Sequence, residues 1–597
     1  MNIQSRIETI RGYMAEAGVR GYIITGFDPH GSEIPPAHWH TREWISGFTG
    51  SAGLVLITAD AAGLWTDFRY WIQAEEELKS SGIALFRDGM PGVPEPLDWL
   101  VSRLSPGDTI AFDGCTVSSQ MAYEWLLTLM NGDLRFNASL DFIANSWLSR
   151  PPMPAERVFE LSKDVSGESR ESRLARVREK LRELRCDTWI ASALDLIAWT
   201  LNIRGSDIPD VPAAVGYLIV QTDSIRWFTN IARLPDSLRK TLERDGITIL
   251  PYENFETRSL PPESRIFIDP RLLNYAITAN LPSGIKQRIG RDPVYLMKSR
   301  KNETEIAHIR RAMEKDGAAL VRFYTRLARI LEDGEKIGEM EAAERLRECR
   351  QSLPGFLGDS FTAIAAVGGN GAVCHYHAKP ESQGIITAGE GLFLLDSGAQ
   401  WEDGTTDITR TTPCRKPTAE EIRDYTRVLK AHITVSRMRF PAGSRGYQID
   451  AIARADMWHY GIDYGHGTGH GVGYRLGVHE GPQVLNSRPV DVVLEPGMIV
   501  SNEPGLYREN CYGIRIENLV VCREAETTEF GQFLCFETLS LAPYCRALID
   551  VNLLSKEEIH WINDYHAQVW KRLYPLLTEE EADWLHKETQ TLEVCAV

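Results

Sequence analysis

The sequence predicts a mixed α/β (α+β) chain of three domains, the first two of which are homologous. The chain has 597 residues, and a domain usually contains about 100 to 200, so a single hydrophobic core cannot accommodate it. Its first half repeats a helix–strand pattern, and its second half alternates helical and β patterns as far as about residue 546. These observations favour two copies of a small α/β domain followed by a larger third domain.

The repeat in the first half is visible in two aligned stretches. "SRIETIRGYMAEAGVRGYIIT" starts at Ser5 and "SRLARVREKLRELRCDTWIAS" starts at Ser172, and each is an amphipathic helical pattern that runs into an apolar strand. After each copy come an aromatic residue, a Gly-Ser turn, a β-rich run and a strand that contains tryptophan. We therefore expect two homologous α/β domains, residues 1–160 and 161–298; a coincidence of helix–strand periodicity is the alternative.

The boundaries of the domains follow from breaks in these patterns. The segment "SRPPMPAE", residues 149–156, contains three prolines, which block regular structure, and is the expected linker between the first two domains. Asn302 with Glu305 has the form of a capping box that opens a long amphipathic helix, so the third domain is expected over 299–597. Its last part, about 547–597, has the pattern of two short amphipathic helices.

Bulk composition excludes several classes of protein. No run approaches the ~18 apolar residues of a membrane span, and the N-terminus lacks the apolar core of a signal peptide. The net charge of -17 argues against a nucleic-acid-binding surface. The ten cysteines are scattered without CxxC pairs, which indicates neither a disulfide framework nor a structural zinc site. We expect a cytoplasmic protein.

A glycine-rich stretch carries three histidines. It reads "DYGHGTGHGVGYRLGVHEGP", residues 463–482, and its glycine spacing fits neither a dinucleotide-binding loop nor a P-loop. His466 and His470 have the spacing of two ligands on one helical face, but the glycines between them disfavour a helix. The stretch is therefore expected to be loop or strand, and its histidines need partners elsewhere in the chain.

Two segments on either side of this stretch carry paired acids. "LFLLDSGAQWEDGTTDITRT" has the pattern of a strand, a turn and a returning strand, with Asp396 and Asp407 on the two arms of a hairpin. "MIVSNEPGLYRENCYGIRIENLVV" repeats this arrangement with Glu503 and Glu517 on either side of a turn-rich centre. All four carboxylates stand beside strongly apolar residues.

Four acids in one partly buried site require counter-ions. Alone they would repel one another and take up protons, whereas two divalent ions would balance their charge. An oxygen-rich set with a single imidazole suits Mn(II), Co(II) or Zn(II) rather than a structural thiolate zinc site. The alternative for any one acid is a turn cap or a solvated side chain, but that does not account for two hairpins with paired acids around a histidine-bearing segment.

These motifs resemble those of a known family. "LLDSGAQWEDGTTDITRT", "HGTGHGVG", "NEPGLY" and "GIRIENLV" are similar to the pita-bread metallopeptidases. With "TGSAG", "LWTDFRYW", "ALDLIAWTLNIRGSDI" and "WLHKETQ", the whole chain resembles the three-domain cytosolic Xaa-Pro aminopeptidases, or aminopeptidases P. The resemblance implies two creatinase-like N-terminal domains, a C-terminal pita-bread catalytic domain, peptide substrates with proline in second position and a homodimer. Two divalent ions, with Mn(II) favoured, are the implied cofactors.

The resemblance also implies roles for individual residues. The metal ligands fall on Asp396, Asp407, His470, Glu503 and Glu517. Asp407 and Glu517 would bridge the two ions, Asp396 would bind one of them, and His470 with Glu503 would bind the other. Three further histidines match residues that stabilise the intermediate or hold substrate, namely His375, His466 and His479; His377 is a rival for the first of these.

The chemistry of peptide hydrolysis completes the assignment. A carboxylate close to a metal-bound water takes its proton, and Glu503 is the expected base. The Xaa-Pro bond has no N–H, so metal polarisation of the carbonyl suits it better than a site that grips that N–H. Arg515, two residues before Glu517 and expected on the same strand face, would hold substrate or a ligand carboxylate, with an ordinary buried ion pair as the alternative. The rival functions are a prolidase, a metal-free creatinase-like hydrolase and a non-catalytic binding module.

Overall fold

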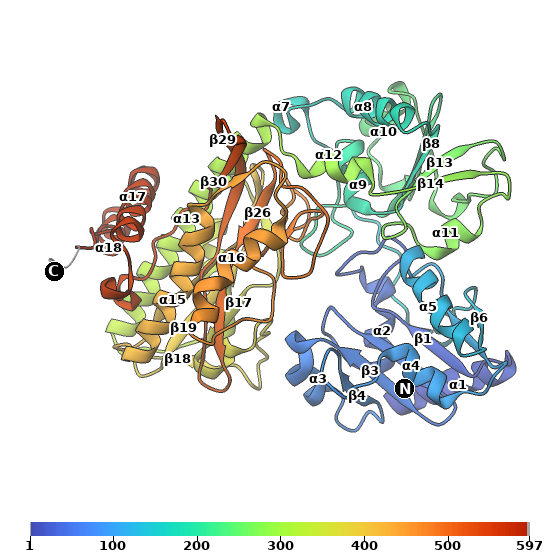
Figure 1. Cartoon of the computed structure of the whole chain (residues 1–597), viewed down its shortest axis with the longest axis horizontal. Helices are drawn as coiled ribbons and strands as arrows, with labels where there is room; N and C mark the ends of the chain where they lie inside the picture. The colour runs from blue at the N-terminus through green and yellow to red at the C-terminus, as the bar shows by residue number, and fades with distance from the viewer. Residues whose placement is uncertain (1, 594–597) are drawn as a thin grey trace. The chain divides into compact units, whose positions relative to one another are not determined.

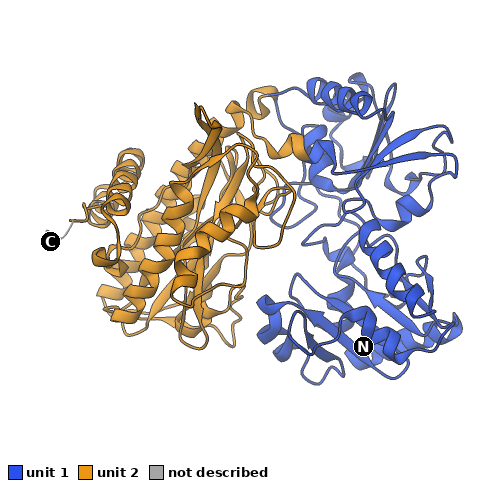
Figure 2. Ribbon diagram, in the orientation of Figure 1, with its two compact units in different colours: residues 1–162, 168–295 blue, residues 163–167, 296–597 orange. Residues whose placement is uncertain are grey.

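The computed structural model describes residues 2–593, which divide into two compact units (Figure 2). Unit 1 comprises the chain up to residue 162 together with residues 168–295, and unit 2 comprises residues 163–167 and the chain from residue 296 onward. Each unit has its own sheets and hydrophobic core. Among the described residues, no helix has both the length and the apolar character that crossing a membrane requires.

Unit 1 contains two six-stranded sheets that have the same design (Figure 1). In each, the first and second strands are parallel, the next two pairings are antiparallel, and the last two are parallel. In sheet order the strands of the first are β4 (Ala84–Arg87), β3 (Ala62–Thr66), β2 (Leu54–Thr58), β1 (Gly21–Ile24), β5 (Thr109–Phe112) and β6 (Arg135–Asn137). Those of the second are β12 (Ile247–Pro251), β11 (Ile225–Thr229), β10 (Gly216–Gln221), β8 (Thr188–Ala191), β13 (Arg265–Ile268) and β14 (Lys286–Ile289).

The helix that precedes the central strand of each sheet follows the register of the sequence repeat. Helices α1 (Ile3–Glu16) and α8 (Arg170–Glu183) both have 14 residues, and both are capped by a side chain at the preceding residue. Each ends two residues before a left-handed residue, Gly18 or Arg185, and the fully buried strands β1 and β8 each start three residues after it. Helix, turn and strand thus repeat with one constant offset, which confirms the predicted duplication.

Short helices accompany both sheets of unit 1. They are α2 (Thr41–Ser46), α3 (Trp71–Glu77), α4 (Pro96–Arg103), α5 (Ser119–Asn131), α6 (Phe142–Ser146), α9 (Leu194–Thr200), α10 (Asp236–Arg244) and α11 (Tyr275–Ala279). The central strands are buried along their whole length, as expected for strands covered on both faces.

The longest described helix of unit 2 begins at the predicted capping box. The side chain of Asn302 accepts from the Glu305 N–H at 2.9 Å, and the Glu305 carboxylate accepts from the Asn302 N–H at 3.0 Å, so the predicted capping box starts a helix of 30 residues. The helices of this unit are α7 (Lys163–Ser166), α13 (Glu303–Glu332), α14 (Glu339–Gln351), α15 (Ala419–Ser436), α16 (Gly446–His459), α17 (Lys556–Leu573) and α18 (Glu579–Glu588). Helix α12 (Pro293–Ser299) spans the division between the units.

Two sheets of unit 2 carry the acid-bearing segments. One has the order β17-β19-β22 and the other the order β23-β30-β29-β26, and both are antiparallel. Their strands are β17 (Ile364–Val367), β19 (Leu392–Ser397), β22 (Ile408–Pro413), β23 (Arg439–Pro441), β26 (Ile499–Asn502), β29 (Asn518–Thr528) and β30 (Gly531–Thr538). Shorter pairings are made by β15 (Ile337–Gly338), β16 (Phe356–Asp359), β18 (Ile385–Ile386), β20 (Ala399–Trp401), β21 (Gly404–Thr405), β24 (Gly469–His470), β25 (Val484–Leu485), β27 (Gly505–Arg508) and β28 (Tyr512–Arg515).

The C-terminal part of unit 2 packs on its helical layer. Val428 and Leu429 of α15 share one core with Ile514 of β28 and with Ile559 and Ile562 of α17. The tail forms the two predicted helices, although α17 has 18 residues and is not short. The described part of the tail is therefore built into the core of unit 2.

Candidate metal centre

The first pair of acids lies on neighbouring antiparallel strands. Asp396 is near the end of β19, opposite Thr409 of β22, and Asp407 immediately precedes β22. Both residues are buried, with 8% of the surface of Asp396 and 3% of that of Asp407 exposed. The hairpin predicted from the sequence therefore brings both carboxylates to the same end of the sheet.

The second pair lies where two other strands meet. β26 ends at Asn502, which pairs with Asn518, the first residue of β29. Glu503 follows Asn502 and Glu517 precedes Asn518, so both glutamates lie just beyond this last strand pair. We expected Arg515 and Glu517 on one strand face; instead β28 ends at Arg515 and Glu517 follows it outside any strand. The Glu517 N–H donates to the carbonyl of Thr409 at 3.1 Å, because the chain changes partner there.

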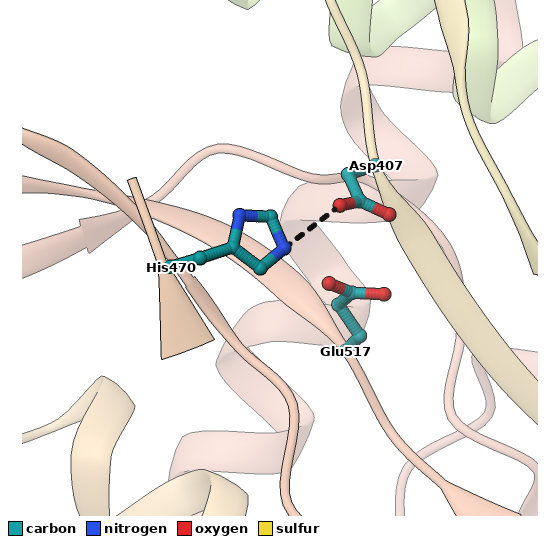
Figure 3. A group of neighbouring side chains, drawn as sticks. All are labelled: Asp407, His470 and Glu517. Atoms are coloured by element: carbon teal, nitrogen blue, oxygen red, sulfur yellow. Dashed lines mark ion pairs between the residues drawn. The ribbon is translucent and has the colours of Figure 1, made fainter. Parts of the chain in front are cut away.

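One imidazole lies among these acids (Figure 3). His470 Nε2 is 3.3 Å from Asp407 Oδ2, the ion pair marked in Figure 3. It is 3.5 Å from Glu503 Oε1. Ligand atoms of Asp407, His470 and Glu517 all lie within 4.8 Å of one another, and Figure 3 shows the three side chains pointing toward a common centre. His470 Nδ1 lies 3.0 Å from the Gly471 carbonyl, which can only accept, so Nδ1 carries a proton and Nε2 is the ring nitrogen that faces the acids.

Electrostatics make the bare cluster unfavourable. Burial raises the pKa of Asp396 to about 6; Arg515 opposes the rise, and Asp407 and Glu503 add to it. Burial together with the same two carboxylates raises the pKa of Glu517 well above its usual range. The Oδ1 atom of Asp396 is buried and makes no hydrogen bond with any described residue. Such a site needs positive charge and leaves a carboxylate oxygen available for it.

A hydrogen-bonded chain runs from the first acid to one of the glycine-stretch histidines. Arg515 donates to Asp396 Oδ2 at 2.7 Å and to the Tyr507 hydroxyl at 2.8 Å. His466 Nδ1 faces the Gly467 carbonyl at 2.7 Å and therefore carries the proton, so Nε2 accepts from the Tyr507 hydroxyl at 2.7 Å. Burial lowers the pKa of His466 and favours this neutral form. The arginine thus contacts a candidate ligand carboxylate.

Tyr507 was not among the residues chosen from the sequence. It belongs to the "NEPGLY" motif, and only its position in that motif pointed to it. Burial raises the pKa of its hydroxyl well above the usual range, which keeps the group neutral as a link between Arg515 and His466.

The remaining histidines flank the same region. The His479 and His470 rings are 4.4 Å apart between centroids and nearly perpendicular. His375 is half-buried and follows Cys374, whose carbonyl accepts from Arg515 at 3.5 Å, whereas the rival His377 is exposed. As predicted, residues 463–482 contain no helix; their only strand is β24, which ends at His470.

Comparison with known proteins assigns this fold to one class of enzymes. The model of Metallopeptidase family M24 matches residues 307–524, and that of the C-terminal region of peptidase M24 matches residues 532–592. Models of the Creatinase/Prolidase N-terminal domain match twice, at residues 6–134 and 149–305. The fold class predicted from the sequence, two homologous creatinase-like domains followed by a pita-bread domain, is confirmed.

Relatives that match almost the whole chain show which members of this metallopeptidase class it resembles. The chain is 38% identical to aminopeptidase P2 of Arabidopsis thaliana, covering 99% of this chain and 89% of the relative. It is 37% identical to Xaa-Pro aminopeptidase 1 of Dictyostelium discoideum, covering 99% and 97%. The crystal structure of X-prolyl aminopeptidase from Caenorhabditis elegans, described as a cytosolic enzyme with a di-nuclear active site, superposes with a TM-score of 0.94 at 32% identity, covering 99% of this chain and 100% of that one. The chain belongs to the Xaa-Pro aminopeptidases of metallopeptidase family M24.

Proposed function

We propose that this chain hydrolyses the bond between an N-terminal residue and a following proline, using two divalent metal ions. The convergence of four buried or half-buried carboxylates and one imidazole in unit 2 carries the proposal. The full-length similarity to aminopeptidase P2 and Xaa-Pro aminopeptidase 1 supports the substrate class.

The proposed ligands fit a pair of divalent ions. They are Asp396, Asp407, His470, Glu503 and Glu517, and two doubly charged ions balance the four carboxylates. Asp396 Oδ1 is buried without a hydrogen-bond partner among the described residues, and His470 Nε2 faces the acids. An oxygen-rich donor set with one nitrogen favours Mn(II), with Co(II) or Zn(II) as alternatives. Asp407 and Glu517 are the proposed bridging ligands.

The side chains around the proposed metal ions have distinct roles in the proposed reaction. When bound, the ions lower the pKa of a water molecule and polarise the scissile carbonyl. Glu503, held by a hydrogen bond from the Ser501 hydroxyl at 3.1 Å, takes the proton of that water and passes it to the departing proline nitrogen. The neutral imidazole of His466 and the side chains of His375 and His479 bind substrate and stabilise the tetrahedral oxyanion. Arg515 fixes the orientation of Asp396 and borders the substrate.

A peptide panel tests the substrate class. The Mn(II)-loaded protein is expected to cleave Xaa-Pro-Yaa tripeptides and longer peptides with proline second, and to leave peptides with alanine second nearly intact. Cleavage confined to Xaa-Pro dipeptides would make the chain a prolidase instead. No cleavage of any of these peptides, in protein with two bound ions, would favour a non-catalytic binding module.

Further properties are proposed on the same basis. Three domains cover residues 1–160, 161–298 and 299–597; each six-stranded sheet lies inside one of the first two, and limited proteolysis near residues 149–156 and 299 would test the division. The proposed location is the cytoplasm, in line with the description of the nematode enzyme as cytosolic. The proposed homodimer rests on the family resemblance, because the tail helices pack on the catalytic unit of their own chain. A monomer mass in solution at micromolar concentration would contradict the dimer.

A further inference from the structure

Hydrogen bonds connect the C-terminal tail of unit 2 to the residues around the acid cluster. They run through a short segment that precedes the tail, residues 540–544, which we call the brace. Two side chains of α17 hold the brace in place. The Tyr565 hydroxyl lies within 3.0 Å of the carbonyls of Ser540 and Ala542 and accepts from the Ala542 N–H at 3.2 Å. His566 Nε2 accepts from the Tyr544 N–H at 3.0 Å. All of these contacts are buried, so solvent does not compete for them.

One connection from the brace to the acid cluster runs through a buried arginine. Arg410, of which 3% is exposed, donates to the carbonyls of Ala542 and Pro543 at 2.8 and 3.0 Å and to the Tyr565 hydroxyl at 3.1 Å. The same guanidinium donates to the Glu517 carbonyl at 2.7 Å. One rigid, fully hydrogen-bonded group therefore fixes the backbone of a proposed ligand relative to the tail.

A second connection runs through a buried histidine. His432 Nδ1 faces the Asn502 carbonyl at 3.0 Å and must carry the proton, so Nε2 accepts from the Tyr544 hydroxyl, also at 3.0 Å. Asn502 directly precedes Glu503. The Tyr544 hydroxyl in turn accepts from Asn518 Nδ2 at 3.0 Å, and Asn518 directly follows Glu517. The Tyr544 hydroxyl thus hydrogen-bonds with His432, which contacts the residue before Glu503, and with Asn518, the residue after Glu517.

Contacts of this kind determine where a ligand carboxylate lies before a metal binds. A carboxylate on an unsupported backbone must be ordered when the ion arrives, and that loss of freedom weakens binding. The tail contributes none of the candidate ligands, yet its brace contacts Asn518, which follows Glu517, and reaches Asn502, which precedes Glu503, through His432. We propose that the C-terminal tail is a positioning element of the metal centre, acting through Tyr544, Arg410 and His432; this rests on the proposed function.

The test compares two tyrosine-to-phenylalanine variants of the full-length protein. Tyr544→Phe removes the hydroxyl that supports His432 and Asn518. Tyr425→Phe is the matched control: Tyr425 is equally buried, and its hydroxyl accepts from the N–H of Cys545 just beyond the brace, at 3.0 Å, without contacting the ligand-flanking residues. Mn(II) binding to metal-free protein is measured by titration calorimetry, and melting temperature is measured alongside it.

Tyr544→Phe is expected to weaken Mn(II) binding roughly ten-fold. This is the lower end of the range seen when a group that supports a metal ligand by hydrogen bonds is removed. Its peptidase activity should fall at low Mn(II) and recover at saturating Mn(II), while Tyr425→Phe binds Mn(II) as the unmodified protein does. Equal Mn(II) affinities of the two variants would overturn the inference alone. An unmodified chain that binds no Mn(II) would overturn the proposed function and the inference together. If Tyr544→Phe does not fold, Tyr565→Phe decides by the same comparison.

Discussion

Replacement of Glu503 by glutamine separates the proposed chemistry from the fold. The glutamate side chain is 18% exposed, accepts from Ser501 at 3.1 Å and lies 3.5 Å from His470 Nε2. Glutamine has the same shape and keeps an acceptor oxygen for Ser501, so the free energy of unfolding should change by less than about 1 kcal/mol. It cannot take a proton at neutral pH and is a weaker metal ligand. The reaction rate should therefore fall while the fold persists.

The size of the effect follows from the role assigned to the carboxylate. Loss of a general base slows a reaction by roughly 10²- to 10⁴-fold, which corresponds to about 3 to 5 kcal/mol of barrier. Hydrolysis of an Xaa-Pro-Yaa tripeptide at saturating Mn(II) measures this loss, and metal analysis and melting temperature are recorded on the same sample. Glu509→Gln is the control, because Glu509 is exposed on the turn between β27 and β28 and undergoes the same chemical change. Full activity of Glu503→Gln would refute the reasoning.

Three other outcomes are expected. Dialysis against a chelator should abolish peptidase activity and Mn(II) should restore it, and activity that survives removal of all metal would contradict the metal centre. Tyr507→Phe, which breaks the link between His466 and Arg515, should lower kcat/KM roughly ten-fold with bound metal unchanged; an unaltered kcat/KM would show that the hydroxyl is dispensable. Burial holds the pKa values of His432 and His566 at about 3, so the unfolded chain binds more protons than the folded chain between about pH 6.5 and 3. The stability that these two histidines contribute is therefore complete above that range and falls as the pH drops, by about 1.4 kcal/mol per pH unit for each histidine. Because buried acids such as Asp396 act in the opposite direction, the measurement is a difference: between pH 7 and pH 5, chemical unfolding of the metal-free proteins should show a smaller loss of stability for His566→Gln than for the unmodified protein.

Local patterns were sufficient to predict the frame of the molecule. The capping box at Asn302, the hairpin that carries Asp396 and Asp407, and the helix–strand repeat all depend on residues a few positions apart, and the structure contains each of them. The non-helical course of the glycine-rich stretch followed from glycine alone. The exception was the expected strand face shared by Arg515 and Glu517, since the chain changes its hydrogen-bond partner between them.

The sequence by itself determined which groups are available for metal chemistry, because residue type, local spacing and family motifs are properties of the linear chain. Only the tertiary structure decided which groups meet. Asp396 and Arg515 are 119 positions apart, and the brace, which lies in the loop after β30, contacts Asn518 at the start of β29. Such pairs depend on strand register and helix packing, which place side chains within 3 Å of one another without leaving a local signal. The links through Tyr507, Arg410 and His432 therefore became visible only in the folded chain.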